Sequence, residues 1–384
     1  MKSVLVISYS RIESDPRVMR QIAALQERYE VKVVGFGPQP SSIGEMVPVS
    51  QEPRQLLARA LSALRLCLRR YEAYYWNQDH VRRTLDVASR FSPDLTVAND
   101  VDALPIALKI AQGRPVVLDA HEYAPKELED DVVWRLLFGP YKQYLCARYL
   151  PQAASMMTVG DAIAQAYCSN FGVMPEVVRN APPYVTQDPS PVGEKIQLIH
   201  PGGVNPSRRL ESLLEMMPLL DDRFELDLML MLNNSRYSQR LQQMAMATKR
   251  VRLIPPVPMP QISSFLNRYD IGVYSLPPNS FNNAHALPNK FFEFVQGRLA
   301  VAVGPTPEMA GFTKRYDLGV VAEDFSPEAM ARALNGLSAD DVRRFKQNAH
   351  LAASELCYEH SKDALFRAID RAFAATRKTV PEAF

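Results

Sequence analysis

The chain has 384 residues, and its 44 lysines and arginines nearly balance 42 aspartates and glutamates, for a formal net charge of +2. That length suggests two domains, each large enough to bury a core of its own. Hydrophobic residues at 47% and charged residues at 22% are ordinary for globular proteins, so a disordered chain is excluded. The balanced charge also excludes a protein built to coat nucleic acid, and we expect no nucleic-acid partner.

Residues 4–8 form a short apolar run that polar residues follow at once, so they predict a first β-strand rather than a secretory signal. No stretch of about 18 apolar residues occurs, so we expect no membrane-spanning segment. The four cysteines are far apart, form no CxxC pair and assemble no zinc pattern with the six histidines. We therefore expect a cytoplasmic protein with reduced, buried thiols.

In the first half of the chain, short apolar runs alternate with longer segments of helical period, which is typical of parallel sheets built from βαβ units. Ser14-Asp15-Pro16 predicts a capped helix start, with Pro16 in the first turn. Further helices are expected over residues 103–111 and 161–171. The expected strands are 4–8, 31–36, 94–98, 116–119 and 156–159.

The alternation stops near residue 177, and the proline-rich residues 181–195 predict a linker. It then restarts with strands at 197–200, 226–232, 251–254, 271–275, 300–303 and 319–321. Helices are expected over 208–217 and 237–248 and near Pro288, Pro307 and Pro327, and the final part from 340 to about 376 is expected to be helical. We predict an α/β fold with two doubly wound, Rossmann-like domains, 1–180 and 196–384, whose parallel sheets face an interdomain cleft. The C-terminal helices are expected to pack back toward the first domain.

Open α/β sheets bind ligands beyond the carboxyl ends of their strands, which directs attention to the loops 9–16, 119–127, 200–209 and 275–293. The second of these loops begins Asp119-Ala120-His121-Glu122. A histidine beside carboxylates at a strand end could bind sugar hydroxyls or move a proton. The alternative is a histidine bonded to local backbone, with the two acids at a helix start.

The third loop contains Gly202, Gly203, Arg208 and Arg209. Paired glycines allow close backbone approach, and the start of a helix favours an anion. Two arginines there could bind a diphosphate, although a Gly-Gly turn before a helix is also common without one.

The fourth loop leads into Pro288, Asn289, Lys290 and Glu293 at a predicted helix start. Asn289 and Glu293 are four residues apart and share one helix face. Glu293 could accept hydrogen bonds from both hydroxyls of a ribose, while Lys290 could meet a phosphate. The alternative is a capped helix with a surface Lys/Glu pair.

Residues 53–76 predict a basic amphipathic helix, with arginines at 54, 59, 65, 69 and 70 and leucines at 57, 61, 64 and 68. We favour a core-facing helix with solvated arginines. The alternative is a peripheral contact of residues 54–76 with an anionic membrane at the inner face of the cell membrane.

Together these loops resemble the GT-B glycosyltransferases, in particular the large retaining family four that includes many bacterial polysaccharide and lipid-sugar assembly enzymes. The resemblance covers most of the chain. Its motifs are Ser14-Asp15-Pro16-Arg17-Val18, Asp119-Ala120-His121-Glu122, Val178-Arg179-Asn180-Ala181-Pro182, Gly202 to Glu211, and Leu287-Pro288-Asn289-Lys290-Phe291-Phe292-Glu293.

The resemblance implies a retaining transferase that moves a sugar from a nucleotide diphosphate-sugar to a glycan or lipid-linked acceptor. The donor would bind the C-terminal domain and the acceptor the N-terminal one. Such enzymes are typically metal-independent, with basic residues and a helix dipole stabilising the leaving diphosphate. The implied catalytic residues are His121 and Glu122. The implied donor site contains Gly202, Gly203, Arg208, Arg209, His285, Asn289, Lys290 and Glu293, and the implied acceptor site Asp15 and Arg17.

The sequence departs from the family pattern at His285, where the earlier of two glutamates often stands, and at Arg209, where a glycine is common. Either arginine could therefore bind the diphosphate. The histidine leaves open a catalytically silent subunit that binds a nucleotide-sugar. A nucleotide-sugar epimerase is the third alternative, although the chain offers few histidine–carboxylate pairs besides His121-Glu122.

Overall fold

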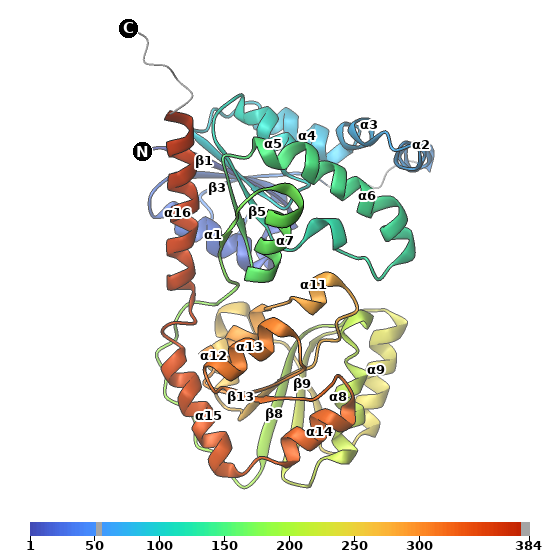
Figure 1. The fold of residues 1–384 in the computed structure, drawn as a ribbon, viewed down its shortest axis with the longest axis vertical. Helices are drawn as coiled ribbons and strands as arrows, with labels where there is room; N and C mark the ends of the chain where they lie inside the picture. Colours follow the sequence, from blue (N-terminus) through green and yellow to red (C-terminus); the bar gives the residue numbers. More distant parts are fainter. Residues whose placement is uncertain (51–55, 378–384) are drawn as a thin grey trace. The chain divides into compact units, whose positions relative to one another are not determined.

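The structure, a computed structural model, describes residues 1–50 and 56–377. For residues 56, 57, 59, 376 and 377 it describes the backbone alone. It divides into two compact units, each built on one sheet (Figure 1). Unit 1 comprises Met1–Val178, Ser280–Asn282 and Lys362–Phe384. Unit 2 comprises Arg179–Asn279 and Asn283–Ser361.

Unit 1 contains a seven-stranded parallel sheet in the order β3-β2-β1-β4-β5-β6-β7. Its strands are β1 (Ser3–Arg11), β2 (Glu30–Phe36), β3 (Glu45–Pro48), β4 (Leu95–Asn99), β5 (Val116–Ala120), β6 (Ser155–Thr158) and β7 (Glu176–Val177). From β1 the chain first builds the sheet outward through β2 and then resumes on the other side at β4, so the topology switches between β1 and β4. That point is where open α/β sheets bind ligands.

The helices of unit 1 connect these strands. They are α1 (Pro16–Gln26), α2 (Leu56–Cys67), α3 (Tyr71–Trp76), α4 (Asp79–Ala88), α5 (Leu104–Ala111), α6 (Val132–Tyr149) and α7 (Asp161–Phe171). Asp15 starts α1 by accepting hydrogen bonds from the backbone N–H groups of Arg17 and Val18 through Oδ1, both at 3.1 Å. The predicted cap and the first-turn proline are therefore confirmed.

Unit 2 contains a six-stranded parallel sheet in the order β10-β9-β8-β11-β12-β13. Its strands are β8 (Ile196–Gly203), β9 (Phe224–Met231), β10 (Val251–Ile254), β11 (Ile271–Tyr274), β12 (Ala300–Val303) and β13 (Gly319–Val321). Its helices are α8 (Glu211–Met216), α9 (Arg236–Ala247), α10 (Ile262–Leu266), α12 (Asn289–Gln296), α13 (Pro307–Arg315), α14 (Pro327–Asn335) and α15 (Ala339–Ala352). Here the topology switches between β8 and β11.

Two further helices include residues of both units: α11 (Phe281–Ala284) and α16 (Tyr358–Arg377).

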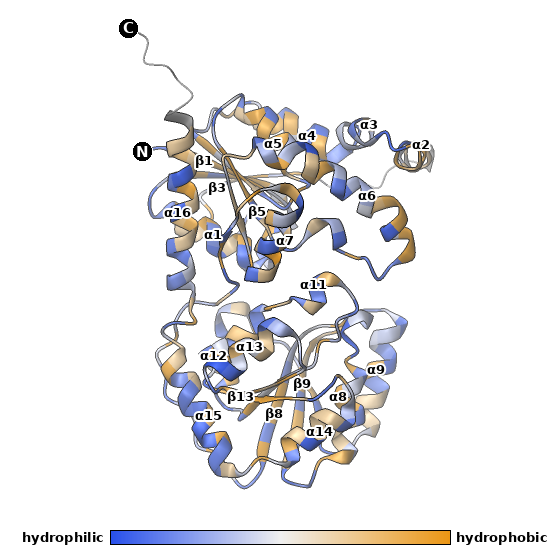
Figure 2. Ribbon diagram, in the orientation of Figure 1, coloured by the Kyte–Doolittle hydropathy of each residue, from blue (hydrophilic) through white to orange (hydrophobic). Residues whose placement is uncertain are grey.

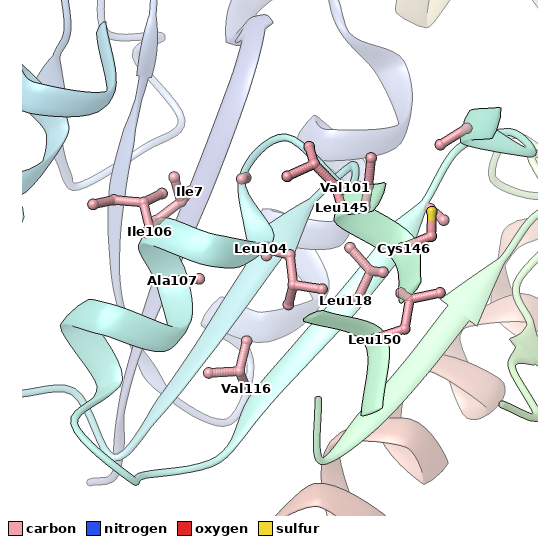
Figure 3. Packing of buried hydrophobic residues seen from close by; sticks show 14 of the residues in the cluster. Ile7, Val101, Leu104, Ile106, Ala107, Val116, Leu118, Leu145, Cys146 and Leu150 are labelled. Carbon is pink, nitrogen blue, oxygen red and sulfur yellow. The ribbon is translucent and has the colours of Figure 1, made fainter. Parts of the chain in front are cut away.

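Each sheet is buried on both faces. In unit 1, Leu104 and Ile106 of α5 and Leu145 of α6 pack with Val116 and Leu118 of β5 (Figure 3). In unit 2, alternate residues of β12 enter two different clusters, Ala300 and Ala302 on one side and Val301 and Val303 on the other. Strands covered on both faces read as continuous apolar runs, and Figure 2 shows that hydrophobic character along β8 and β9.

The predicted doubly wound α/β fold is confirmed. Three expectations about individual elements are wrong. The helix predicted over 53–76 is two helices, α2 and α3, because Arg69 takes a left-handed backbone conformation with φ 54°. The helix predicted over 208–217 begins only at Glu211, after a left-handed Arg209 with φ 46°. The helical region predicted over 340–376 is confirmed, as the two helices α15 and α16. The third error concerns the thiols, which were expected to be buried, since Cys67 is exposed.

Candidate functional site

A pair of cations lies at the carboxyl end of β8 in unit 2. Gly202 has φ +144°, and a Cβ atom there would lie 2.4 Å from Cε and 2.6 Å from Nζ of Lys290. Nη1 of Arg208 donates to the carbonyl oxygen of Gly203 at 3.0 Å. The glycine thus leaves the space that Lys290 occupies, and two positive side chains gather at the switch point of this sheet.

The surroundings of Lys290 disfavour its positively charged form. Burial, and after it the positive charge of Arg208, lower the pKa of Lys290 to about 8, while Glu293 acts in the opposite direction. Its Nζ lies 5.3 Å from the ring centroid of Tyr274, the last residue of β11. One carboxylate thus faces two cations, which is an arrangement that an anion would stabilise.

Several buried polar atoms around this edge have no hydrogen-bond partner among the described residues. They are Nε2 of His200, Oδ1 of Asn289 and Oγ1 of Thr306. Nδ1 of His200 donates to the carbonyl oxygen of Val273 at 2.9 Å, and burial lowers the pKa of this histidine to about 3, so the ring is neutral. Because buried polar atoms are nearly always paired in native proteins, unpaired ones indicate a place for a ligand.

The structure distinguishes the two arginines of the Gly202–Arg209 loop. Arg209 is exposed, and Ser212 donates to its backbone carbonyl. Arg208 is half-buried and close enough to Lys290 to lower its pKa. Of the two, Arg208 is therefore the arginine in the cationic pair. Neither lies in the first turn of α8, which begins at Glu211; Arg208 ends the short 3-10 helix Pro206–Arg208.

The remaining donor residues of the prediction lie on or just before α12. Asn289 and Glu293 share one face of that helix, as predicted, with Pro288 at its N-cap. His285 and Glu293 are half-buried. Sequence reasoning did not single out His200, Tyr274 or Thr306. His200 ends a predicted strand, Tyr274 is the next-to-last residue of one, and Thr306 follows one, which was the available signal.

In unit 1, His121 lies in a polar cluster at the carboxyl ends of β4 and β5. Its backbone N–H donates to Oδ1 of Asp100 at 3.0 Å, and its Nε2 donates to Oδ1 of Asn99 at 3.2 Å. Nδ1 lies 3.4 Å from Oδ2 of Asp100. The ring is thus held by side chains of a neighbouring strand end rather than by local backbone alone, and it remains partly exposed.

Asp15 and Arg17 already have partners inside unit 1. Asp15 caps α1, while the buried Arg17 donates to Asp119 through Nε and Nη2 at 3.0 and 2.5 Å and to the carbonyl of Val178 at 2.6 Å. Nε2 of Gln21 donates to the same aspartate at 2.7 Å. Acceptor binding by Asp15 and Arg17 stays a prediction, and these contacts favour a structural role.

Glu122 and Lys142 bring further charge to this region. Burial, followed by the nearby acids Glu127 and Asp100, raises the pKa of Glu122 well above its usual range. Burial alone would lower the pKa of Lys142, but ion pairs with Asp102 and Glu127 raise it. The raised pKa favours the protonated form of Glu122, which is the form that a general acid needs.

Within residues 1–50 and 56–377, no group of three or more His, Cys, Asp or Glu side chains is placed to hold a metal ion. No helix in the same ranges combines the length and the apolar character needed to cross a bilayer.

No protein-family model matches the sequence, and no curated protein matches it. Solved structures do. Alr3699/HepE from Anabaena, in complex with UDP-glucose, has a TM-score of 0.73 and 14% identity over 96% of this chain and 100% of that one. Sucrose-phosphate synthase from Thermosynechococcus elongatus has a TM-score of 0.72 and 11% identity over 98% and 100%. TarM has a TM-score of 0.71 and 10% identity over 97% and 99%. These likenesses show that the chain has the GT-B glycosyltransferase fold.

Proposed function

We propose that this chain is a retaining glycosyltransferase that transfers a sugar from a nucleoside diphosphate-sugar to a glycan or lipid-linked acceptor. The observation that carries the proposal is the cationic pair of Arg208 and Lys290 beside Gly202, surrounded by unpaired polar atoms. The likeness to a protein crystallised with UDP-glucose supports a UDP-sugar as donor.

The cationic pair would bind the diphosphate and stabilise it as it leaves. Breaking the bond between sugar and phosphate places negative charge on the departing diphosphate, and fixed cations aimed at that charge lower the barrier. Lys290 gains most from this partner, because a nearby dianion favours its charged form and offsets the repulsion from Arg208. These two side chains can do the work that a divalent cation does elsewhere, so we propose transfer without a metal.

Glu293 would bind the ribose of the donor nucleotide. It lies one turn after Lys290 on the same helix, so a diphosphate held by the lysine would bring the adjoining ribose toward its carboxylate. A carboxylate can accept hydrogen bonds from both ribose hydroxyls at once.

On unit 1, we propose that His121 binds the transferred sugar and that Glu122 acts beside it. His121 is oriented by Asn99 and Asp100 at a strand end. Retention of configuration would follow from departure of the diphosphate and attack of the acceptor on the same face of the sugar.

UDP binding tests the donor site. UDP should raise the melting temperature of the wild-type protein, since a ligand of the folded state alone stabilises it. Arg208→Ala and Glu293→Ala should lose that shift, whereas Arg209→Ala, which removes the exposed neighbour, should keep it. Equal shifts in all four proteins would refute the assignment.

Hydrolysis of UDP-glucose without acceptor tests the chemistry. We expect slow release of glucose whose first-formed anomer, observed by NMR, is the α form of the donor. Release of the β form would contradict retention. Binding of UDP-glucose with no turnover, with or without acceptors, would instead favour a silent nucleotide-sugar-binding subunit.

A further inference from the structure

Unit 1 contains a cavity of about 850 Å³ that the donor chemistry does not use. It is bordered by the ends of three neighbouring strands: Tyr9 of β1, Phe36 of β2 and Asp102 just after β4. The cavity therefore lies at the topological switch point of this sheet. Its volume falls in the range of about 300–1,000 Å³ that is typical of small-molecule sites.

The apolar residues in the walls of the cavity are mostly aromatic, and polar residues line the rest. Besides Tyr9 and Phe36 the apolar residues include Leu66 of α2, Tyr74 and Tyr75 of α3, and Trp134, Leu137, Phe138 and Tyr141 of α6. On α6 these residues follow the helical period and form one face of the helix. This apolar part of the lining favours an aliphatic chain or a ring over a fully hydroxylated sugar.

The polar side chains of the cavity include an ion cluster. Nζ of Lys142 contacts Asp102 and lies 2.8 Å from Oε2 of Glu127, and all three residues line the cavity. Asp102 follows Asp100 by two residues, and Asp100 contacts His121. The polar side of the cavity is thus connected with the residues that we propose to bind the transferred sugar.

The outer surfaces of the same two helices carry exposed apolar side chains. On α2, Leu61 and Leu64 are 45% and 53% exposed, and Leu68 just beyond the helix is 60% exposed. On α6, Val133 and Leu136 are 62% and 68% exposed. The first turns of α6 are largely orange in Figure 2. The preference for a core-facing helix at 53–76 is therefore wrong for these leucines.

Arginines are close in sequence to these apolar side chains. Arg69, Arg70 and Arg135 are exposed and Arg65 is half-buried. At the start of α6 two exposed acids, Asp130 and the cap residue Asp131, also precede the apolar residues, so the basic character is strongest at α2. Arg54 lies outside the described residues. Exposed leucines with arginines beside them, as on α2, suit the headgroup region of an anionic bilayer, where the apolar groups insert and the cations meet lipid phosphates.

We propose that the acceptor is amphiphilic, that its hydrocarbon chain occupies this aromatic cavity, and that α2 and α6 take it from an anionic membrane surface. The role of this amphiphile as the acceptor rests on the proposed function. Its binding in the cavity does not depend on that function. An acceptor held in this way would present its polar end near Asp102 and keep its chain between α2 and α6.

Alkyl glucosides below their micelle concentrations test the cavity. Decyl glucoside should bind at least about tenfold more tightly than hexyl glucoside in calorimetric titration, because each fully buried methylene strengthens binding about fourfold. Ala63 lines the cavity and is exposed, so Ala63→Trp should fill the space and weaken decyl glucoside binding about tenfold. Ala60→Trp, on the same helix but outside the lining, is the matched control and should bind as the wild type does.

Vesicle sedimentation tests the membrane surface. The wild type should bind vesicles of equal parts phosphatidylglycerol and phosphatidylcholine, and bind pure phosphatidylcholine at least about tenfold more weakly. Leu64→Glu should abolish binding, whereas Leu351→Glu, which changes an exposed leucine of α15, should not. Equal binding to both kinds of vesicle, or by both variants, would overturn the membrane part of the proposal.

UDP-induced stabilisation, measured on the same preparations, separates this inference from the proposed function. If the Ala63→Trp variant keeps the UDP-induced rise in melting temperature but loses decyl glucoside binding, the result supports amphiphile binding in the cavity. Absence of chain-length dependence with a normal UDP shift would overturn the cavity and leave the donor assignment standing. Chain-length-dependent binding without any UDP shift would refute the donor assignment alone.

Discussion

Binding of UDP should weaken as the pH rises through about 8, because Lys290 loses its charge there. With a pKa of about 8, the lysine is about nine-tenths protonated at pH 7 and about one-tenth protonated at pH 9. A bound diphosphate favours the charged lysine and should bring its pKa back toward 10.5, the ordinary value. Binding at pH 9 must then include uptake of a proton, which makes it less favourable.

The size of the effect follows from the two pKa values. If the bound lysine titrates near 10.5 and the free one near 8, linkage predicts that UDP affinity falls about tenfold between pH 7 and pH 9, or about 1.4 kcal/mol. The stability of the unliganded protein has the opposite sign. Between about 8 and 10.5 the unfolded chain binds more protons at this lysine than the folded chain does, so the contribution of Lys290 to stability rises with pH.

Isothermal titration of UDP at pH 7, 8 and 9, with Lys290→Arg as the comparison, measures this prediction. An arginine keeps its charge over the whole range, so the variant should show a nearly flat affinity whatever its absolute value. A tenfold loss that persists in Lys290→Arg would assign the titration to another group. An affinity that is flat in the wild type would refute the inference that the lysine contacts the diphosphate.

Three further predictions concern packing, buried charge and metal. Gly202→Ala should weaken UDP binding about tenfold and cost about 1–2 kcal/mol of stability, because its Cβ would displace Lys290 and its φ is unfavourable for alanine; UDP titration and urea unfolding measure the two effects. Asp119→Asn should cost about 3–5 kcal/mol in urea unfolding, because it leaves the charge of Arg17 buried without its partner. Glu13→Gln, in an exposed ion pair, is the control and should change stability by less than about 1 kcal/mol. Release of glucose from UDP-glucose should continue in excess EDTA, since the two cations stabilise the leaving group; a loss that Mg²⁺ restores would contradict metal-free transfer.

Much of the fold could be predicted because strands buried on both faces read as apolar runs. The strand Ala300–Val303 is entirely buried, and its run of four apolar residues predicts it from the sequence. The missed strands are short: Glu45–Pro48 lies at one edge of its sheet and Glu176–Val177 at the other, where pairing rather than pattern defines them. Helix α6 was missed too, since it has a proline at position 140 and apolar residues around its first turns.

The site was predicted in part, for a related reason. Residues in loops after strands stand out by their type, and Arg208, Lys290 and His121 were found in that way. Whether Arg208 or Arg209 joins Lys290 depends on a left-handed backbone at Arg209, which arginine seldom adopts and no sequence pattern announces. Periodicity similarly predicted which leucines share one face of α2. It did not predict whether they are buried, because burial depends on the neighbouring elements.

The proposed donor site of unit 2 can also be recognised because its side chains destabilise the protein when no ligand is bound. A lysine with a lowered pKa faces an arginine there, and buried polar atoms of His200 and Thr306 have no partner among the described residues. The structural ion pair of unit 1 differs, since Arg17 and Asp119 are buried but satisfy each other. Burial alone therefore does not mark the ligand site, because both places are buried and only one is left unsatisfied. The unsatisfied edge gains stability when an anion arrives, whereas the satisfied pair would have to be broken to bind one. On this physical ground the cationic pair, and not Arg17, is where the donor diphosphate should bind.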